Sequence, residues 1–244
     1  MLGVDFFTGE LDAVVDGSLS EGGLLVAPSA PGLAVDFVRS AAYREALLGA
    51  DWAITDSGFM VLLWRLRTGR KLPRHSGLKF MRAVLEREML REAGAVFWVM
   101  PSEEEKARTQ AWLVAHGFSV DEKDFYLAPF YGAGAVNDEE LTRRIEERKP
   151  RAVVLGIGGG VQERLGFGLK QRLSFRPAIF CTGAAIAFLS GGQASIPPWA
   201  DRLMLGWLLR ILSEPRKYWR RYWEALRLGV LLLRWRDKLP PLRG

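Results

Sequence analysis

A carboxylate stands in a short polar turn after an apolar stretch, in the run Ile54-Thr55-Asp56-Ser57-Gly58. An aspartate that leaves a buried strand is suited to act as a general base towards an incoming hydroxyl group. The same run also suits a structural role, because Asp56 or Ser57 can cap a helix that begins at Gly58. On these residues alone, the capping role is the favoured interpretation and catalysis is the alternative.

A second candidate site is the glycine-rich run 156–163, which follows another apolar stretch. Backbone N–H groups in such a run can approach a phosphate at the positive end of the next helix. A valine occupies the third glycine position of a dinucleotide fingerprint, no acid follows about 20 residues on, and a P-loop lysine is absent. The run therefore favours a nucleoside diphosphate over NAD or ATP, and a tight turn that needs glycine for packing stays equally open. The candidate ligand-binding residues are Gly156, Gly158, Gly160, Gln162 and Glu163.

Two weaker candidates are Ser29, which follows an apolar stretch, and Arg74, which could neutralise a phosphate or belong to a polar loop. Other kinds of site are poorly supported. The chain has two histidines and one cysteine, so an ordinary Cys/His zinc set is absent and we expect no metal site. Ser/His/Asp catalysis lacks its Gly-x-Ser-x-Gly turn.

Alternating strands and helices must position these residues. Short apolar runs alternate with amphipathic stretches, and this pattern predicts an α/β fold with a parallel sheet covered by helices on both faces. The expected strands are Gly23–Ala27, Asp51–Thr55, Ala95–Met100, Phe118–Val120, Arg151–Ile157 and Pro177–Thr182. The expected helices lie near 31–48, 58–68, 77–93, 102–115, 137–149 and 161–173. In an open sheet of this kind, ligands bind beyond the carboxyl ends of the strands.

The chain of 244 residues has a net charge of +6, and this charge is concentrated near the end. Residues 201–244 contain eleven Lys and Arg against four Asp and Glu, so they carry +7 and the first 200 residues carry −1. Two helices are expected there, at 200–212 and 217–235, and the second mixes tryptophans with arginines. This pattern is typical of a helix at a membrane interface, and a helix packed on the core with a solvated basic face is the alternative.

Several bulk properties bear on the location of the protein. The single cysteine, Cys181, excludes an intrachain disulfide and suits a reducing cytoplasm. The first residues do not resemble a signal peptide. No uncharged apolar run approaches the length of about 20 residues that a spanning helix needs.

Four segments, in the correct order, resemble the WecG/TagA/CpsF family of glycosyltransferases. Residues 51–77 resemble its "Asp-Gly … Gly … Pro-x-Arg-x-x-Gly" stretch, and residues 154–163 its "Gly-x-Gly-x-Pro-x-Gln-Glu". Residues 182–191 resemble "Gly-Gly-x-Phe-Asp-Phe-x-Ala-Gly", and residues 197–221 resemble "Ala-Pro-x-Trp … Glu-Trp-x-x-Arg … Glu-Pro-x-Arg". The resemblance spans about residues 24–223.

The resemblance implies a Rossmann-like core, expected at 1–195, and a basic, helical membrane-docking appendage, expected at 196–244. It implies an inverting, metal-independent transfer of an N-acetylhexosamine-type sugar from a UDP-sugar to a polyprenyl-diphosphate-linked acceptor, with no cofactor. Asp56 becomes the candidate base, and the 156–163 run with Ser29 becomes the donor site. Arg74, Arg210 and Arg216 become candidates to neutralise the diphosphate. The implied location is the inner face of the cell membrane, with a homo-oligomer as one option and no nucleic acid as partner.

The chain also departs from the family pattern. Alanines stand at positions 27 and 187, where the family has a threonine and an aspartate, and Gly206 replaces a glutamate. These departures favour a second hypothesis, a non-catalytic membrane-associated scaffold with a degenerate transferase fold. A nucleic-acid binder that uses the basic tail is a third hypothesis, although no recognised nucleic-acid module is present.

Overall fold

A six-stranded parallel sheet forms the centre of the molecule in the computed structural model, which describes residues 1–192 and 227–243. The strands are β1 Gly23–Val26, β2 Trp52–Ala53, β3 Val96–Met100, β4 Phe125–Leu127, β5 Ala152–Leu155 and β6 Ala178–Cys181. They lie in the order β2-β1-β6-β5-β3-β4, and every neighbouring pair is parallel. The predicted α/β class with a parallel sheet is confirmed.

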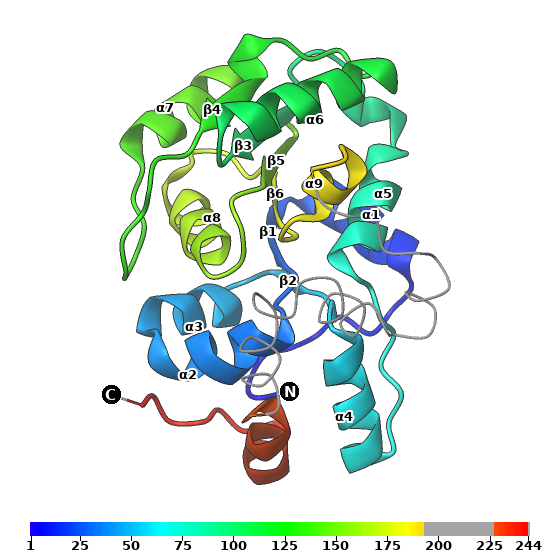
Figure 1. Cartoon of the computed structure of the whole chain (residues 1–244), viewed down its shortest axis with the longest axis vertical. Helices are drawn as coiled ribbons and strands as arrows, with labels where there is room; N and C mark the ends of the chain where they lie inside the picture. The colour runs from blue at the N-terminus through cyan, green and yellow to red at the C-terminus, as the bar shows by residue number, and fades with distance from the viewer. Residues whose placement is uncertain (193–226, 244) are drawn as a thin grey trace.

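Helices cover both faces of this sheet (Figure 1). One face carries the π-helical turn η1 Gly32–Asp36 with α2 Phe37–Arg39, α3 Ala41–Leu48, α7 Glu139–Arg148 and α8 Val161–Arg172. The other face carries α1 Leu11–Glu21, α5 Gly77–Leu85, α6 Glu103–Ala115 and α9 Ala185–Leu189. The remaining elements are α4 Gly58–Thr68 and the 3-10 turns η2 Glu88–Leu90 and η3 Glu122–Asp124.

Alternation along the strands divides the core into two layers. Successive side chains of a strand point to opposite faces, so Leu24 and Val26 pack under α3 and α8 while Leu25 packs under α1 and α5. Among the described residues, the largest fully buried side chain is that of Trp98 in β3. The inner strands are buried at every position, as is typical of a parallel sheet covered on both faces.

One expected strand, Phe118–Val120, is wrong. Gly117, with φ of +80°, ends α6, and the amide of Phe118 donates to the main-chain oxygen of Leu113 at 3.0 Å. This bond is the one that closes a Schellman helix end, in which an apolar residue after the glycine packs back on the helix. Phe118 is buried for this reason, and the strand at this edge, β4, begins at Phe125.

The helix predictions are correct for α4, α6, α7 and α8 within two residues at each end, and need three corrections. The helix expected at 31–48 is divided at Ser40, whose extended backbone starts α3 and whose Oγ accepts a hydrogen bond from the Tyr43 amide at 3.2 Å. The helix expected at 77–93 ends at Leu85. Helices α1 and α9 were not expected. In α1, Gly17 is a poor helix former, and it is needed because a β-carbon there would lie 2.9 Å from the Trp52 ring.

The described C-terminal residues pack on the core. Residues 227–235 are helical, and Leu228, Leu231 and Leu232 are buried in the same layer as Met60 and Trp64 of α4. The chain that follows is fixed by main-chain hydrogen bonds, from Leu2 to Arg236 at 2.7 Å and from Arg243 to Val38 at 2.7 Å. The described part of the tail is therefore a packed helix with one solvent-exposed face. The expected boundary at 195/196 and the helix at 200–212 lie outside the described residues.

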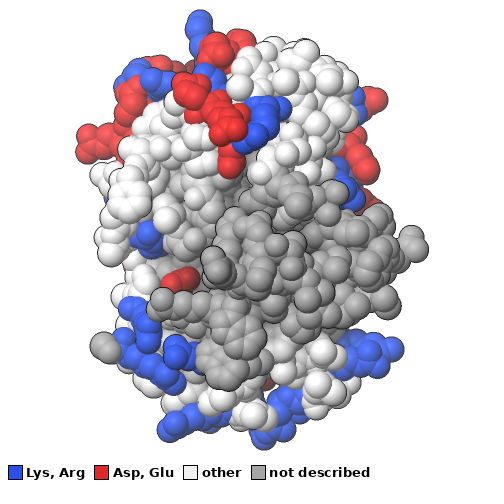
Figure 2. Space-filling model, viewed as in Figure 1, with Lys and Arg blue, Asp and Glu red and all other residues white. Residues whose placement is uncertain are grey.

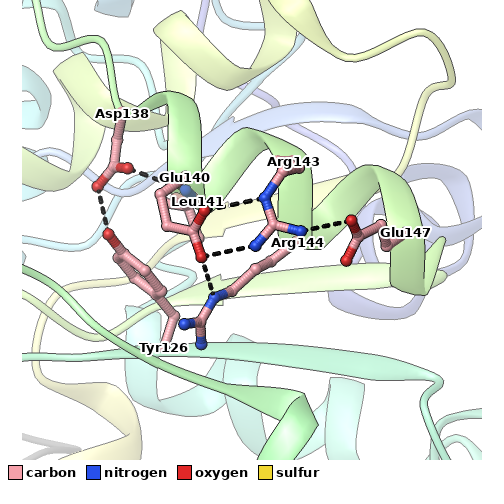
Figure 3. Close-up of polar contacts among 7 residues, drawn as sticks. All are labelled: Tyr126, Asp138, Glu140, Leu141, Arg143, Arg144 and Glu147. Carbon is pink, nitrogen blue, oxygen red and sulfur yellow. Dashed lines mark hydrogen bonds and ion pairs between the residues drawn. The ribbon is translucent and has the colours of Figure 1, made fainter.

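The opposite end of the sheet carries charges that are neutralised locally (Figure 3). On α7, the Arg143 guanidinium bridges Glu140 and Glu147, and Arg144 donates to Glu140 at 2.8 Å. The Arg143 and Arg144 bonds lower the pKa of Glu140 to about 2. Such exposed pairs contribute little to stability, but they pair the arginines of this helix with carboxylates on the same surface.

Candidate functional site

The carboxyl ends of β1, β2, β5 and β6 meet at one edge of the sheet, because all four strands are parallel and adjacent. The chain leaves β1 towards the face covered by η1 and α2, and it leaves β6 towards the opposite face, where α9 lies. Adjacent strands whose connections leave to opposite faces open a crevice between them, which is the usual ligand site of such sheets. The geometry therefore places the candidate site at the carboxyl ends of β1 and β6.

Asp56 lies at this edge, in the turn between β2 and α4. Its Oδ1 accepts a hydrogen bond from the amide of Gly77, the first residue of α5, at 2.9 Å. The neighbouring Ser57 caps α4, with its Oγ accepting from the Met60 amide at 3.3 Å. The capping interpretation is thus confirmed for Ser57, whereas the Asp56 carboxylate is held against a different helix, at the positive end of α5.

The loop between α4 and α5 brings Arg74 beside Asp56, although 18 residues separate them. The Arg74 Nε donates to the main-chain oxygen of Asp56 at 3.2 Å. Next to this contact, the Thr55 hydroxyl donates to the main-chain oxygen of Pro73, and His75 Nε2 lies 2.7 Å from the Gly9 oxygen. A carboxylate and a guanidinium at one strand end combine a candidate base with a candidate diphosphate-binding cation.

Gly77 joins this cluster to β6. A β-carbon on Gly77 would lie 2.6 Å from the main-chain oxygen of Thr182, the residue after β6. No side chain fits in that space, so α5 begins in direct contact with the end of β6. Ser76 fixes the same helix start, because its Oγ accepts from the Lys79 amide at 3.3 Å.

The glycine-rich loop stands at the end of β5, as the sequence predicts. The Gly156 amide continues the sheet with a 2.8 Å bond to the Val99 oxygen. Gly158 and Gly160 have φ of +92° and +90°, a conformation that L side chains rarely adopt, and nothing lies within 4 Å of a β-carbon at Gly158 or Gly159. The loop is therefore open, and it leads into the N-terminus of α8, a helix of 12 residues.

Gln162 and Glu163 lie beneath this loop, each only 1% exposed. The Gln162 Oε1 accepts from the Gly183 amide at 3.2 Å, and its Nε2 donates to Glu163 Oε1 at 3.1 Å. The other Glu163 oxygen accepts from the Gly160 amide at 2.6 Å. The two side chains thus connect the glycine loop to the turn after β6. Burial raises the pKa of Glu163 to about 7.

Ser29 has a local partner in the turn after β1. Its Oγ accepts from the Gly32 amide at 3.2 Å, which starts η1. At the end of η1, Asp36 Oδ2 lies 3.8 Å from where a β-carbon of Gly160 would stand. Asp36 and Gly183 are site neighbours to which sequence reasoning gave no role: Asp36 lies in no recognised pattern, and Gly183 lies in the 182–191 segment that was used only for the family resemblance.

Two predicted site residues, Arg210 and Arg216, lie outside the described residues. Cys181 is buried at the end of β6, its Sγ donates to the Gln162 oxygen at 3.3 Å, and burial raises the pKa of the thiol. In residues 1–192 and 227–243, no group of three or more His, Cys, Asp or Glu side chains is arranged to hold a metal ion. In the same residues, no helix is long and apolar enough to cross a bilayer.

Comparison with known proteins gives one family. The model of the family described as "Glycosyl transferase WecG/TagA/CpsF family" matches residues 2–241, which is nearly the whole chain. No match is found among curated proteins.

Proposed function

We propose a specific reaction for this chain, which belongs to the WecG/TagA/CpsF family of glycosyltransferases. Membership of the family makes it a glycosyltransferase of cell-surface polysaccharide synthesis. The proposed reaction is the inverting, metal-independent transfer of an N-acetylhexosamine-type sugar from a UDP-sugar to a polyprenyl-diphosphate-linked acceptor. The observation that carries this proposal is the position of Asp56, a carboxylate held at the carboxyl edge of the sheet beside Arg74.

Asp56 is the proposed general base. The acceptor hydroxyl attacks the anomeric carbon, the bond from that carbon to the diphosphate oxygen breaks, and its electron pair leaves with UDP. The hydroxyl proton passes to Asp56. The Gly77 amide donates to Oδ1 of this carboxylate and so helps to hold it at the carboxyl edge of the sheet. A single displacement of this kind inverts the anomeric configuration.

The departing UDP gains negative charge that positive groups must stabilise. Arg74 lies beside Asp56 and is proposed to stabilise this charge. Arg210 and Arg216 are proposed for the same task. The open glycine loop at Gly156–Gly160 and Ser29 are proposed to line the donor site. Gln162 and Glu163 support the donor loop from below, so their proposed contribution is to its position.

The acceptor is a membrane lipid in this proposal, so the enzyme works at the inner face of the cell membrane as a peripheral protein. Residues 196–244 are proposed to dock on the lipid, and self-association into a homo-oligomer is compatible with this arrangement. No nucleic-acid partner is proposed. Support comes from the net charge of +7 in residues 201–244 and from the outward face of the packed C-terminal helix.

A non-catalytic scaffold is the second candidate, favoured by the alanines at positions 27 and 187. Both side chains are buried, at 7% and 3% exposure, where the family pattern has polar groups. A scaffold would keep the fold and bind membrane or UDP without turnover.

The test is UDP release from UDP-N-acetylhexosamines with a short-chain polyprenyl-diphosphate-linked sugar. We expect release to require the acceptor and to fall by about a hundredfold or more in both Asp56→Asn and Asp56→Ala. Ser57→Ala is the matched control, because it removes the neighbouring helix cap at a cost of about 1 kcal/mol but leaves the carboxylate in place. If the wild type binds UDP but releases no UDP from any donor, the scaffold hypothesis is established instead.

A further inference from the structure

Helix α4 exposes apolar side chains on its outer face. Met60 and Trp64 on its inner face are buried, whereas Leu62 is 48% and Leu66 is 76% exposed. Leu62 and Leu66 are four residues apart, so they lie one above the other on one face of the helix. Arg65 is exposed beside them. Single exposed leucines are common, but two on one face with an arginine at the side of that face form an amphipathic surface that faces away from the core.

The C-terminal helix repeats this pattern beside α4. A β-carbon on Gly229 would lie 3.9 Å from the Leu63 side chain, so the two helices are in contact. The inner faces of both helices pack in the same layer of the core. The outer face of the C-terminal helix exposes Val230 and Leu233, each at 63%. Figure 1 shows α4 and this helix at the same end of the molecule.

This end of the molecule is positively charged. No Asp or Glu occurs from Ser57 to Lys71, a stretch that contains Arg65, Arg67, Arg70 and Lys71, and residues 227–243 have five Lys and Arg against Asp237 alone. Figure 2 shows Lys and Arg gathered at this end, with uncharged surface between them, whereas acidic and basic groups mix at the other end. The exposed basic residues are Arg65, Arg70, Lys71, Arg227, Arg234, Arg236, Lys238 and Arg243.

The charges at the two ends differ in their pairing. On α6 and α7, cations pair with carboxylates, for example Lys106 with Glu122 and Arg143 with Glu140. Among the described residues, no ion pair joins Arg65, Arg70 or Lys71 to a carboxylate. Within the described part of the chain, these three cations are therefore available to an external anion, and the exposed leucines beside them suit an anion that borders an apolar phase.

We propose that α4 is the second half of a bilayer-docking surface, and that its outer face lies with the outer face of helix 227–235 on anionic phospholipid. This inference rests on the proposed function, in which the C-terminal residues dock on the membrane. Leucines of both helices enter the headgroup region while the arginines contact lipid phosphates. A nucleic acid offers the same phosphates but no apolar phase that could receive the leucines.

The proposed docking surface also determines how far Asp56 lies from the lipid. Helix α4 begins at Gly58, two residues after Asp56, and its 11 residues span about 16 Å. With α4 on the bilayer, Asp56 lies within about one helix length of the lipid. The sugar of a membrane-held acceptor extends from the lipid by its diphosphate, so α4 sets the height at which that sugar meets the base.

The test is flotation of the full chain with vesicles of phosphatidylglycerol and phosphatidylcholine. We expect the double variant Leu62→Gln, Leu66→Gln to bind at least about tenfold more weakly than the wild type, because both exposed apolar groups are lost. Leu233→Gln should weaken binding as well. Val114→Gln is the matched control, since this residue is 58% exposed on α6 at the other end and should leave binding unchanged. Circular dichroism and thermal unfolding confirm that each variant is folded.

The outcomes separate this inference from the proposed function. If the wild type binds vesicles and Leu233→Gln weakens this binding but the α4 double variant does not, only the role of α4 is overturned. A wild type that binds no vesicle would overturn the membrane part of the proposed function and this inference with it. UDP release with a short, water-soluble acceptor should be equal in wild type and the α4 double variant, whereas release with a vesicle-held acceptor should fall with binding. Loss of activity with both acceptors would place the defect in the active site and refute the docking role.

Discussion

Replacing Gly77 by alanine adds one methyl group at the point where α5, Asp56 and the end of β6 meet. The added carbon would lie 2.6 Å from the Thr182 main-chain oxygen, whereas an ordinary contact begins at 3.4 Å. The start of α5 must therefore move by about 0.8 Å, because the opposing atom belongs to the backbone of a buried strand end and cannot turn aside. That displacement acts directly on the Gly77 amide, which donates to Asp56 Oδ1.

Two effects of this substitution oppose each other. Overpacking of this kind costs about 1–3 kcal/mol, whereas replacing glycine by alanine gains about 0.4–1 kcal/mol by restricting the unfolded chain. The net expectation is a loss of about 1–2 kcal/mol, which lowers Tm by about 2–8 °C for a chain of this size. Activity should fall further than stability, by about 10- to 100-fold in kcat, because a base misplaced by about 1 Å loses its alignment with the acceptor hydroxyl.

Thermal unfolding and acceptor-dependent UDP release measure these two effects separately. Gly132→Ala is the control, since Gly132 has nothing within 4 Å of its β-carbon and a backbone that alanine can adopt. Its Tm and kcat should match the wild type. If Gly77→Ala kept the kcat of the control while its Tm fell as expected, α5 would not orient Asp56, and our account of the base would be refuted.

Two further predictions concern the support of the glycine loop. The carboxyl of Glu163 has a usual pKa of 4.5 and one of about 7 when buried here, so the folded state keeps a proton that the unfolded state loses. The stabilisation that this proton provides is complete below pH 4.5 and is lost by about pH 7, so the free energy of unfolding should fall by about 3 kcal/mol over that range. Urea unfolding of wild type and Glu163→Gln at pH 4.5 and 8 tests this, and an equal pH dependence in both would contradict it. Gln162→Ala leaves the Gly183 amide and one Glu163 oxygen without their partner, so we expect a loss of about 2–4 kcal/mol in urea unfolding. A loss below about 1 kcal/mol would show that Gln162 does not hold the two turns together.

Local chemistry made much of the framework predictable from the sequence. Hydroxyl caps at Ser57 and Ser102 mark the starts of α4 and α6, and the inner strands appear as continuous apolar runs. The same local reasoning failed at Phe118, because an apolar residue that closes a helix end resembles the start of a strand. A short apolar run does not distinguish the two, since the difference lies in the glycine before it.

The candidate site was predictable in its positions but not in its side-chain directions. The turns that hold Asp56 and Gly156 were identified because parallel strands must end at one edge. The contact of Arg74 with Asp56 could not be derived from a separation of 18 residues, as it depends on the path of a loop. The inward direction of Gln162 and Glu163 depends on burial by distant segments, which a local pattern does not record.

The contacts of the site bear on whether the departure at position 187 disables the enzyme. Asp56 contacts the Gly77 amide, α5 abuts Thr182, and the following Gly183 amide donates to Gln162 beneath the donor loop. The proposed base and the proposed donor loop are thus positioned through one turn, which is fixed from two sides before α9 begins. Ala187 lies within α9 and is buried with its small side chain packed, so the turn needs no carboxylate at that position to hold its shape. The contacts that hold Asp56 are therefore complete without the family's aspartate, which favours the proposed active transferase over the scaffold.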